Sequence, residues 1–156
     1  IDYLLAWHRQ ARSNGGAWTG GKTIDVMDGY EGFAGFEWSD GKPPPPMPDT
    51  TIVMGDFNSE PDSEEFQRMV GTFDPLYGQA DHLDGFVDSW TVARERSGDD
   101  ACITWVPDPP GRAPGHGVRL DYCFVSPDLG HKVASAWVDN AAKSSDHLPY
   151  WVELDH

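Results

Sequence analysis

The fold is decided by residues 51–58, which read TIVMGDFN. The segment begins with β-branched residues, is too short for a stable helix, and has a proline shortly before and after it. Because alternate residues of an extended strand share a face, we expect Asp56 and Asn58 on one face and Phe57 on the other. The segment therefore predicts a central strand that ends in a carboxylate and a carboxamide directed at one site.

Two later apolar segments also carry polar groups at or near a strand. Residues 118–125 read VRLDYCFV and place Asp121 inside an apolar strand, where an unpaired charge would be costly. Residues 144–149 read SSDHLP and put Asp146 and His147 directly before a third apolar run. A single motif of this kind is more often a turn or an ordinary surface group. Three of them on three strands predict acidic and imidazole groups that converge.

The ordered motifs GDFN, RLDY and SDH, at residues 55–58, 119–122 and 145–147, resemble the endonuclease/exonuclease/phosphatase superfamily. That group includes DNase I, exonuclease III-type nucleases, neutral sphingomyelinases and inositol polyphosphate phosphatases. The resemblance covers residues 51–154. It implies a mixed α/β (α+β) fold, a four-layer α/β/β/α sandwich with two face-to-face sheets and helices outside. The segment that precedes the second aspartate in the inositol phosphatases is not found around Arg119, which argues against that branch.

The resemblance also implies that the sequence is the C-terminal portion of a domain. Family members have an earlier half that supplies an asparagine, a glutamate that is a principal metal ligand, and a histidine or tyrosine near the phosphate. Nothing in this sequence matches those residues. We therefore expect residues 1–156 to form one partial domain with mainly one sheet, interrupted by a Gly- and Pro-rich insertion at residues 13–49. The missing N-terminal half is an expected partner, and the chain alone is expected to be inactive.

The activity implied by the resemblance is hydrolysis of phosphate esters with Mg²⁺ or Mn²⁺, ions that prefer oxygen ligands and leave positions for water and substrate. Asp56 would orient or deprotonate the attacking water and bind metal, and Asn58 would hold a phosphate oxygen. Asp121 would fix the tautomer of His147, whose imidazolium would face the phosphate. Asp146 would bind the metal directly or through water.

Further expectations concern residues around these motifs. Trp105 is either a wall of the substrate pocket or a packing residue, and Arg119 and His116 are candidates for phosphate contacts. Phe57 and Tyr122 are assigned to the core. Two cysteines are too few for a disulfide framework, so we expect both to pack; they are Cys102 and Cys123.

The composition bears on the substrate. The formal net charge is −15, from 26 acidic and 11 basic residues, and such a field repels long polyanions. We therefore favour a small phosphodiester or a phospholipid headgroup, with a DNA or RNA nuclease as the alternative. A non-catalytic fragment or binding domain is the alternative from another class. No apolar run approaches the roughly 20 residues that span a bilayer, and the compartment stays open. The basic residues nearest the predicted site are Arg112, Arg119, Lys132 and Lys143.

The remaining segments predict helices and strands on both sides of the motifs. Residues 1–12 fit a helix. Asp62 as N-cap and Glu65 three residues later fit the start of another helix, a capping box, and Gly71 fits its end. Residues 86–93 fit a short helix or a strand. The other predicted segments are a short strand at 23–27, a polyproline II strut at 43–46, and strands at 101–106, 118–125, 133–138 and 148–154.

Overall fold

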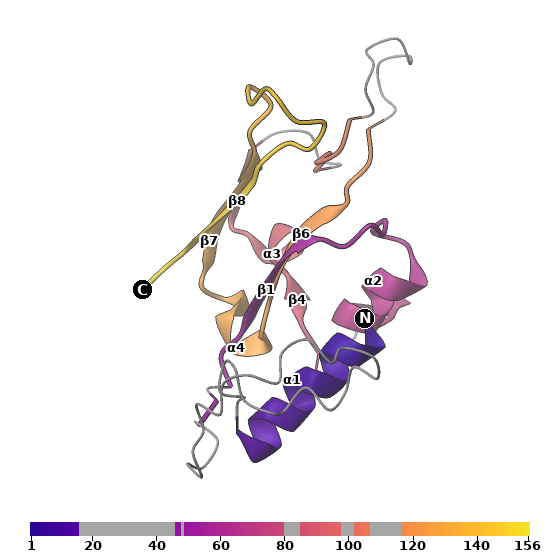
Figure 1. Cartoon of the computed structure of the whole chain (residues 1–156), viewed down its shortest axis with the longest axis vertical. Helices are drawn as coiled ribbons and strands as arrows, with labels where there is room; N and C mark the ends of the chain where they lie inside the picture. The colour runs from indigo at the N-terminus through magenta and orange to yellow at the C-terminus, as the bar shows by residue number, and fades with distance from the viewer. Residues whose placement is uncertain (16–45, 48, 80–84, 98–101, 107–116) are drawn as a thin grey trace, which may run out of the picture. The chain divides into compact units, whose positions relative to one another are not determined.

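The structure, a computed structural model, describes residues 1–15, 46–47, 49–79, 85–97, 102–106 and 117–156 (Figure 1). Two compact units are present, one formed by residues 2–49 and the other by residues 50–156 together with Ile1. Some predictions lie outside the described residues: the strand at 23–27, most of the polyproline segment, the role of the insertion, and His116.

In the first unit, α1 spans Asp2–Asn14. Gly15 follows it with a φ of 87°, a left-handed backbone that glycine adopts without steric cost. Its N–H donates to the Ala11 carbonyl at 2.9 Å. Arg12, in the last turn, forms a 3.2 Å ion pair with Asp49. This pair links the helix to the far end of the same unit.

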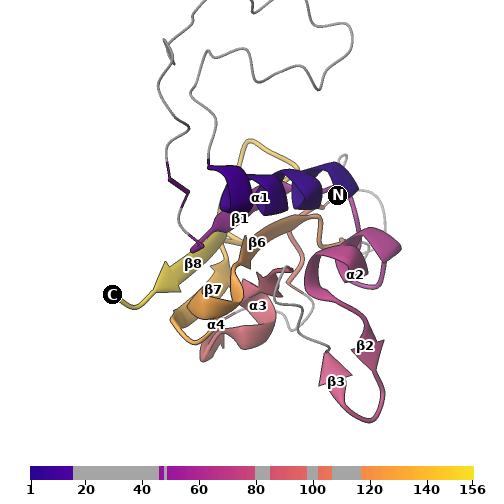
Figure 2. The ribbon, with the colours of Figure 1, turned by 90° about the horizontal axis from the view of Figure 1, so that it is seen from below.

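The second unit contains two three-stranded sheets and a separate two-stranded hairpin (Figures 1 and 2). Its elements in chain order are β1 (Ile52–Asp56), α2 (Glu64–Val70), β2 (Phe73–Asp74), β3 (Gly78–Gln79), β4 (Val87–Asp88), α3 (Ser89–Val92), β5 (Glu95–Ser97), β6 (Asp121–Val125), α4 (Pro127–Gly130), β7 (Val133–Val138) and β8 (Tyr150–Leu154). The sheet orders are β1-β6-β4 and β5-β7-β8, and β2 pairs with β3 in the hairpin. The described residues thus form two main sheets, where the sequence predicted mainly one.

β6, and not β1, is the central strand of the first sheet among the described strands. It pairs antiparallel with β1 on one side and with β4 on the other, and four of its five residues are buried. β1 lies at the edge, where Ile52 is 46% and Met54 66% exposed. Both segments are apolar in sequence, and nothing in their composition says which one has neighbours on both sides.

Alternate residues of β6 pack in opposite directions. The rings of Tyr122 and Phe124 contact the Phe66 ring of α2, with centroid distances of 5.5 and 6.0 Å. Cys123 and Val125 lie instead in a buried cluster that includes Val133 of β7, and partly buried residues of β8 pack against it. The layers therefore follow the order α2, first sheet, second sheet, and the two sheets share a core. This is a mixed α/β arrangement, as predicted.

Ser63, and not Asp62, caps α2. The Ser63 hydroxyl oxygen accepts the Phe66 N–H at 3.2 Å. Because the cap lies one residue later than predicted, Phe66 rather than Glu65 occupies the third helical position and the capping box is not formed. Gly71 ends the helix with a φ of 88°, as predicted.

We expect Ser63→Ala to lower the free energy of unfolding by about 1 kcal/mol, because the Phe66 amide loses its acceptor. Asp62→Ala is the control and should lower it by less than about 0.5 kcal/mol. Chemical denaturation followed by far-UV circular dichroism measures both changes. A larger loss in Asp62→Ala than in Ser63→Ala would contradict this assignment of the cap.

The remaining predictions are met in part. Residues 86–93 contain both predicted alternatives, since β4 is followed directly by α3. Residues 102–106 form no regular strand, and Trp105 makes isolated bridges instead. Cys102 and Cys123 are free and buried, as expected. In the described part of the chain, no helix is both long and apolar enough to cross a membrane.

Candidate functional site

Asp56 and Asn58 come together at the end of β1 through a turn rather than through the strand pleat. Asn58 lies beyond the strand and has a φ of 48°, a left-handed backbone that asparagine tolerates better than most residues. Its backbone N–H donates to Asp56 Oδ1 at 2.8 Å, and its side-chain amide donates to Asp56 Oδ2 at 3.0 Å. The two groups are adjacent as predicted, but the cause is a side-chain turn that also orients the Asp56 carboxylate.

Asp121 is the first residue of β6 and lies directly opposite Asp56 in the β1–β6 register. The predicted strand at 118–125 is therefore shorter, and Asp121 stands at its start rather than in its middle. Directly opposed residues of an antiparallel pair point to the same face. The Asp56 and Asp121 side chains are 36% and 21% exposed, so solvent and substrate have access to both carboxylates.

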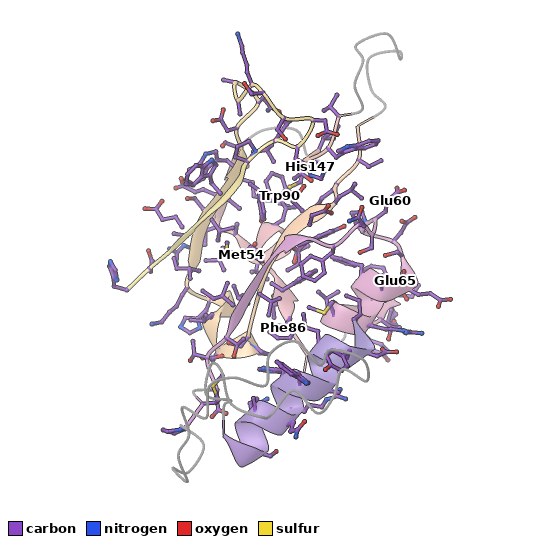
Figure 3. The ribbon with its side chains drawn as sticks, viewed as in Figure 1. Met54, Glu60, Glu65, Phe86, Trp90 and His147 are labelled. Atoms are coloured by element: carbon purple, nitrogen blue, oxygen red, sulfur yellow. The ribbon has the colours of Figure 1, made fainter. Side chains whose placement is uncertain are left out.

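His147 lies between these carboxylates, beside the end of the first sheet (Figure 3). Its Nδ1 is 2.8 Å from Asp121 Oδ2, and its Nε2 is 4.0 Å from Asp56 Oδ2. Since an ionised carboxylate only accepts hydrogen bonds, Nδ1 carries the shared proton. The hydrogen bond to Asp121 raises the pKa of His147 against the opposing effect of desolvation, and the charges of Asp121, Asp56 and Asp146 raise it further.

Thr104 joins the strand of Asp121 to the segment of His147, a role that was not predicted from the sequence. Its buried hydroxyl oxygen accepts the Leu120 and Asp121 amides at 3.0 and 2.9 Å. Its carbonyl accepts the Leu148 amide at 2.6 Å. The available signal was a threonine between two apolar residues in ITW, because a hydroxyl buried there needs a partner.

Trp105 lies beside the site and contacts the residue that precedes His147. Its backbone forms isolated bridges to Val118 and His147, and its indole N–H donates to Asp146 Oδ2 at 3.0 Å. That hydrogen bond lowers the pKa of the Asp146 carboxyl. Neither of the two predicted roles of Trp105 included this polar contact.

The predicted metal ligands do not form a cluster by themselves. Within the described ranges, no group of three or more His, Cys, Asp or Glu side chains is arranged to hold a metal ion. Asp56 accepts hydrogen bonds from Asn58, and Asp146 accepts one from Trp105. Mg²⁺ commonly takes one or two carboxylates and completes its shell with water and substrate phosphate. The chemistry of the two carboxylates therefore fits such an ion.

Arg119 is a core residue, and the structure contradicts the predicted phosphate contact. Its two terminal guanidinium nitrogens donate to the buried Asp88 carboxylate at 2.8 and 2.6 Å. The cation also lies over the Tyr122 ring, 4.4 Å from the centroid. Asp88 stands in the apolar stretch GFVDSW, where an unpaired charge would be as costly as at Asp121, so the sequence carries a signal for a buried partner.

An open cavity of about 600 Å³ lies next to the Arg119 and Asp88 pair. Its described lining includes neither Asp56 nor Asp121 nor His147. The hollow and the candidate site are therefore different places, and the site is recognised by its converging charged groups rather than by its concavity.

Comparison with known proteins identifies the family. The model of the Endonuclease/Exonuclease/phosphatase family matches residues 32–147, which is more than half of the chain and contains all three motifs. No curated protein matches the chain significantly. Members of the family are hydrolases of phosphoester bonds and generally use divalent metal ions. The resemblance of the three motifs is thus confirmed, and the chain belongs to the Endonuclease/Exonuclease/phosphatase family.

Proposed function

We propose that this protein hydrolyses phosphate esters with the help of Mg²⁺, at the site formed by Asp56, Asn58, Asp121 and His147. The observation that carries the proposal is the position of His147, whose Nδ1 is bonded to Asp121 while its Nε2 stands 4.0 Å from Asp56. That separation is too long for a direct hydrogen bond. It suits an arrangement in which an oxygen of the phosphate or of water contacts both groups.

We also propose that the two sheets belong to a four-layer α/β/β/α sandwich. The order of α2, first sheet and second sheet supports three of its layers. Trp137 and Trp151 support the fourth, because their rings stack at 6.1 Å on the face of the second sheet that points away from the shared core. Trp151 is 52% exposed there, as expected of a face that another layer would cover.

Asp121 and His147 would act on the phosphate as a unit. Because Asp121 accepts the hydrogen bond from Nδ1, Nε2 is the nitrogen that meets a phosphoryl oxygen. The raised pKa of His147 favours the imidazolium, which can donate to that oxygen as negative charge builds in the transition state.

Asp56 and Asn58 would act on the water and on a phosphate oxygen. The Asp56 carboxylate is held by two hydrogen bonds and remains accessible, so it can orient or deprotonate a water for in-line attack. The Asn58 amide has two hydrogens, and the bond to Asp56 uses only one of them. The second hydrogen is the one proposed to bind phosphate.

Mg²⁺ would be held by Asp56 and Asp146 together with water and phosphate, and Mn²⁺ would be an alternative. The bound ion would supply positive charge to the phosphoryl oxygens.

Charge supports a small phosphodiester or headgroup as the substrate. Of the four basic residues nearest the motifs, Arg119 is paired with Asp88, and Arg112 lies outside the described residues. At most three of the four can therefore contact phosphate, against a net charge of −15. Three cations are few for a protein that tracks a long nucleic-acid backbone, which usually requires several phosphate contacts.

Hydrolysis of a small aryl phosphodiester and nicking of plasmid DNA test the proposal, each measured from low to physiological salt on the parent domain that includes the predicted N-terminal half, because the chain alone is expected to be inactive. We expect hydrolysis of the small ester that EDTA abolishes and Mg²⁺ restores, with a KM that changes less than about twofold with salt. Efficient nicking with a KM that rises about tenfold or more would reassign the substrate to nucleic acid. Failure to cleave either substrate with metal present would favour the non-catalytic alternative.

A further inference from the structure

Asp146 lies on an exposed turn directly before His147. Ser144 has a φ of 83°, and residues 144–146 form consecutive bends rather than regular structure. A carboxylate in such a place samples several rotamers unless a partner selects one. The indole N–H of Trp105, 3.0 Å from Asp146 Oδ2, is such a partner.

We propose that Trp105 is a positioning residue whose indole N–H fixes the Asp146 carboxylate beside His147, in the orientation that binds the metal ion or its water. This inference rests on the proposed function. It differs from a role as pocket wall, because Trp105 acts through Asp146 and does not have to touch the substrate.

The main chain of Trp105 is itself firmly placed. Its N–H donates to the Val118 carbonyl at 2.9 Å, and the Val118 N–H donates to its carbonyl at 3.0 Å. The next residue, Val106, donates its N–H to the Asp146 carbonyl at 2.9 Å. Val118 precedes Asp121 by three residues, so Trp105 is anchored to the segment that delivers Asp121. Its indole therefore holds Asp146 relative to the other half of the site.

An indole is well suited to this task. It is a hydrogen-bond donor only, so it matches an ionised carboxylate. It is also neutral, so it orients Asp146 without cancelling the negative charge that a cation requires. Lysine or arginine at position 105 would form an ion pair with Asp146 and would compete with the metal. Hydrogen bonds from outside the ligand shell commonly change metal affinity or activity by about 10- to 100-fold.

A double-variant cycle tests the inference. Trp105→Phe keeps an aromatic ring but removes the donor, and we expect it to lower kcat for the small phosphodiester about tenfold with little change in KM. In an Asp146→Ala background the same substitution should cost less than about twofold, because no carboxylate remains to be positioned. Trp137→Phe is the matched control and should leave kcat unchanged, since the Trp137 ring stacks on Trp151 in the second sheet.

The indole ¹H–¹⁵N signal of Trp105 provides a readout that needs no activity. Asp146→Ala should shift this signal and speed its exchange with solvent, whereas Asp146→Asn retains an oxygen acceptor and should keep the N–H protected. An unchanged signal in Asp146→Ala, or losses of kcat that multiply in the double variant, would overturn the positioning role. If the wild-type protein cleaves no phosphate ester while Asp146→Ala still shifts the signal, the proposed function fails and the contact between Trp105 and Asp146 is upheld.

Discussion

Replacing His147 with alanine should lower the turnover of a phosphate ester by about 100-fold or more, since a positioned general acid or base commonly contributes about 10²- to 10⁴-fold. Alanine removes the imidazole that is bonded to Asp121 and faces Asp56. Asp121→Asn should cost more than about tenfold, because an amide donor next to Nδ1 selects the wrong tautomer of the ring.

The two losses are expected not to add, because Asp121 and His147 act as a unit. Steady-state kinetics on the small phosphodiester measures the single and double variants, and circular dichroism checks that they fold. His131→Ala is the matched control, since His131 is an exposed histidine that ends α4. Near-full turnover in a folded His147→Ala variant would show that the pairing has no part in catalysis.

The same pair makes stability depend on pH. The pKa of His147 is raised from the ordinary value of 6.5 in the folded protein, so folding favours the protonated ring. This stabilisation is fully present below about pH 6.5 and is lost as the pH rises through the raised pKa. Unfolding curves of wild type and His147→Ala, compared across this range, should therefore differ less at the alkaline end than at the acidic end.

Asp88→Ala should lower the free energy of unfolding by about 3 to 5 kcal/mol, because it leaves a buried charge unpaired. The side chains of Asp88 and Arg119 are only 1% and 4% exposed. Burial alone would lower the pKa of Arg119, but the hydrogen bonds and charge of Asp88 hold it above its ordinary value. The guanidinium therefore stays charged, and it cannot escape the loss of its partner by releasing a proton.

Removing the charges of both Asp88 and Arg119 should lower the free energy of unfolding by less than removing Asp88 alone. The double variant Asp88→Ala/Arg119→Met is expected to be more stable than Asp88→Ala alone, since no buried ion is left. Glu64→Ala is the control, because its 4.0 Å contact with Arg68 is exposed and should contribute less than about 0.5 kcal/mol. Equilibrium denaturation measures all three variants. Equal losses in Asp88→Ala and Glu64→Ala would contradict the role of the buried pair.

The convergence of Asp56, Asp121 and His147 could be predicted because three ordered motifs each place a polar group at or near an apolar segment. Local sequence carries that information. The details differ, since Asp121 lies at the start of its strand rather than in its middle and β8, which follows His147, belongs to the second sheet. The partner of Arg119 could not be predicted in the same way. The local sequence around Arg119 would be the same whether its guanidinium faced solvent or paired with a buried acid. Asp88 is 31 residues away, and a contact over that distance has no local signature.

Two other features were ambiguous for different reasons. Asp62 and Ser63 are adjacent and both are good cap residues. The sequence therefore does not show which one caps α2 until the first helical residue, Glu64, is known from the structure. The central position of β6 depends on pairing with β4, whose two residues are too few to be recognised as a strand from sequence. The pairing of β6 with β4 in the folded protein thus determines which strand is central, which the composition does not show.

The register of the edge strand β1 makes the position of Asp56 depend on residues at the opposite end of the strand. At the end of β1 far from the site, the Thr51 N–H donates to Ser126 Oγ at 2.9 Å, and the Ser126 N–H donates to the Thr51 carbonyl at 2.8 Å. Five residues at about 3.3 Å each separate this double hydrogen bond from Asp56 by roughly 17 Å. A slip of one residue would turn Asp56 to the opposite face of the sheet, away from His147. Ser126 therefore helps to keep Asp56 on the same face as His147 from a distance, without contact with either residue.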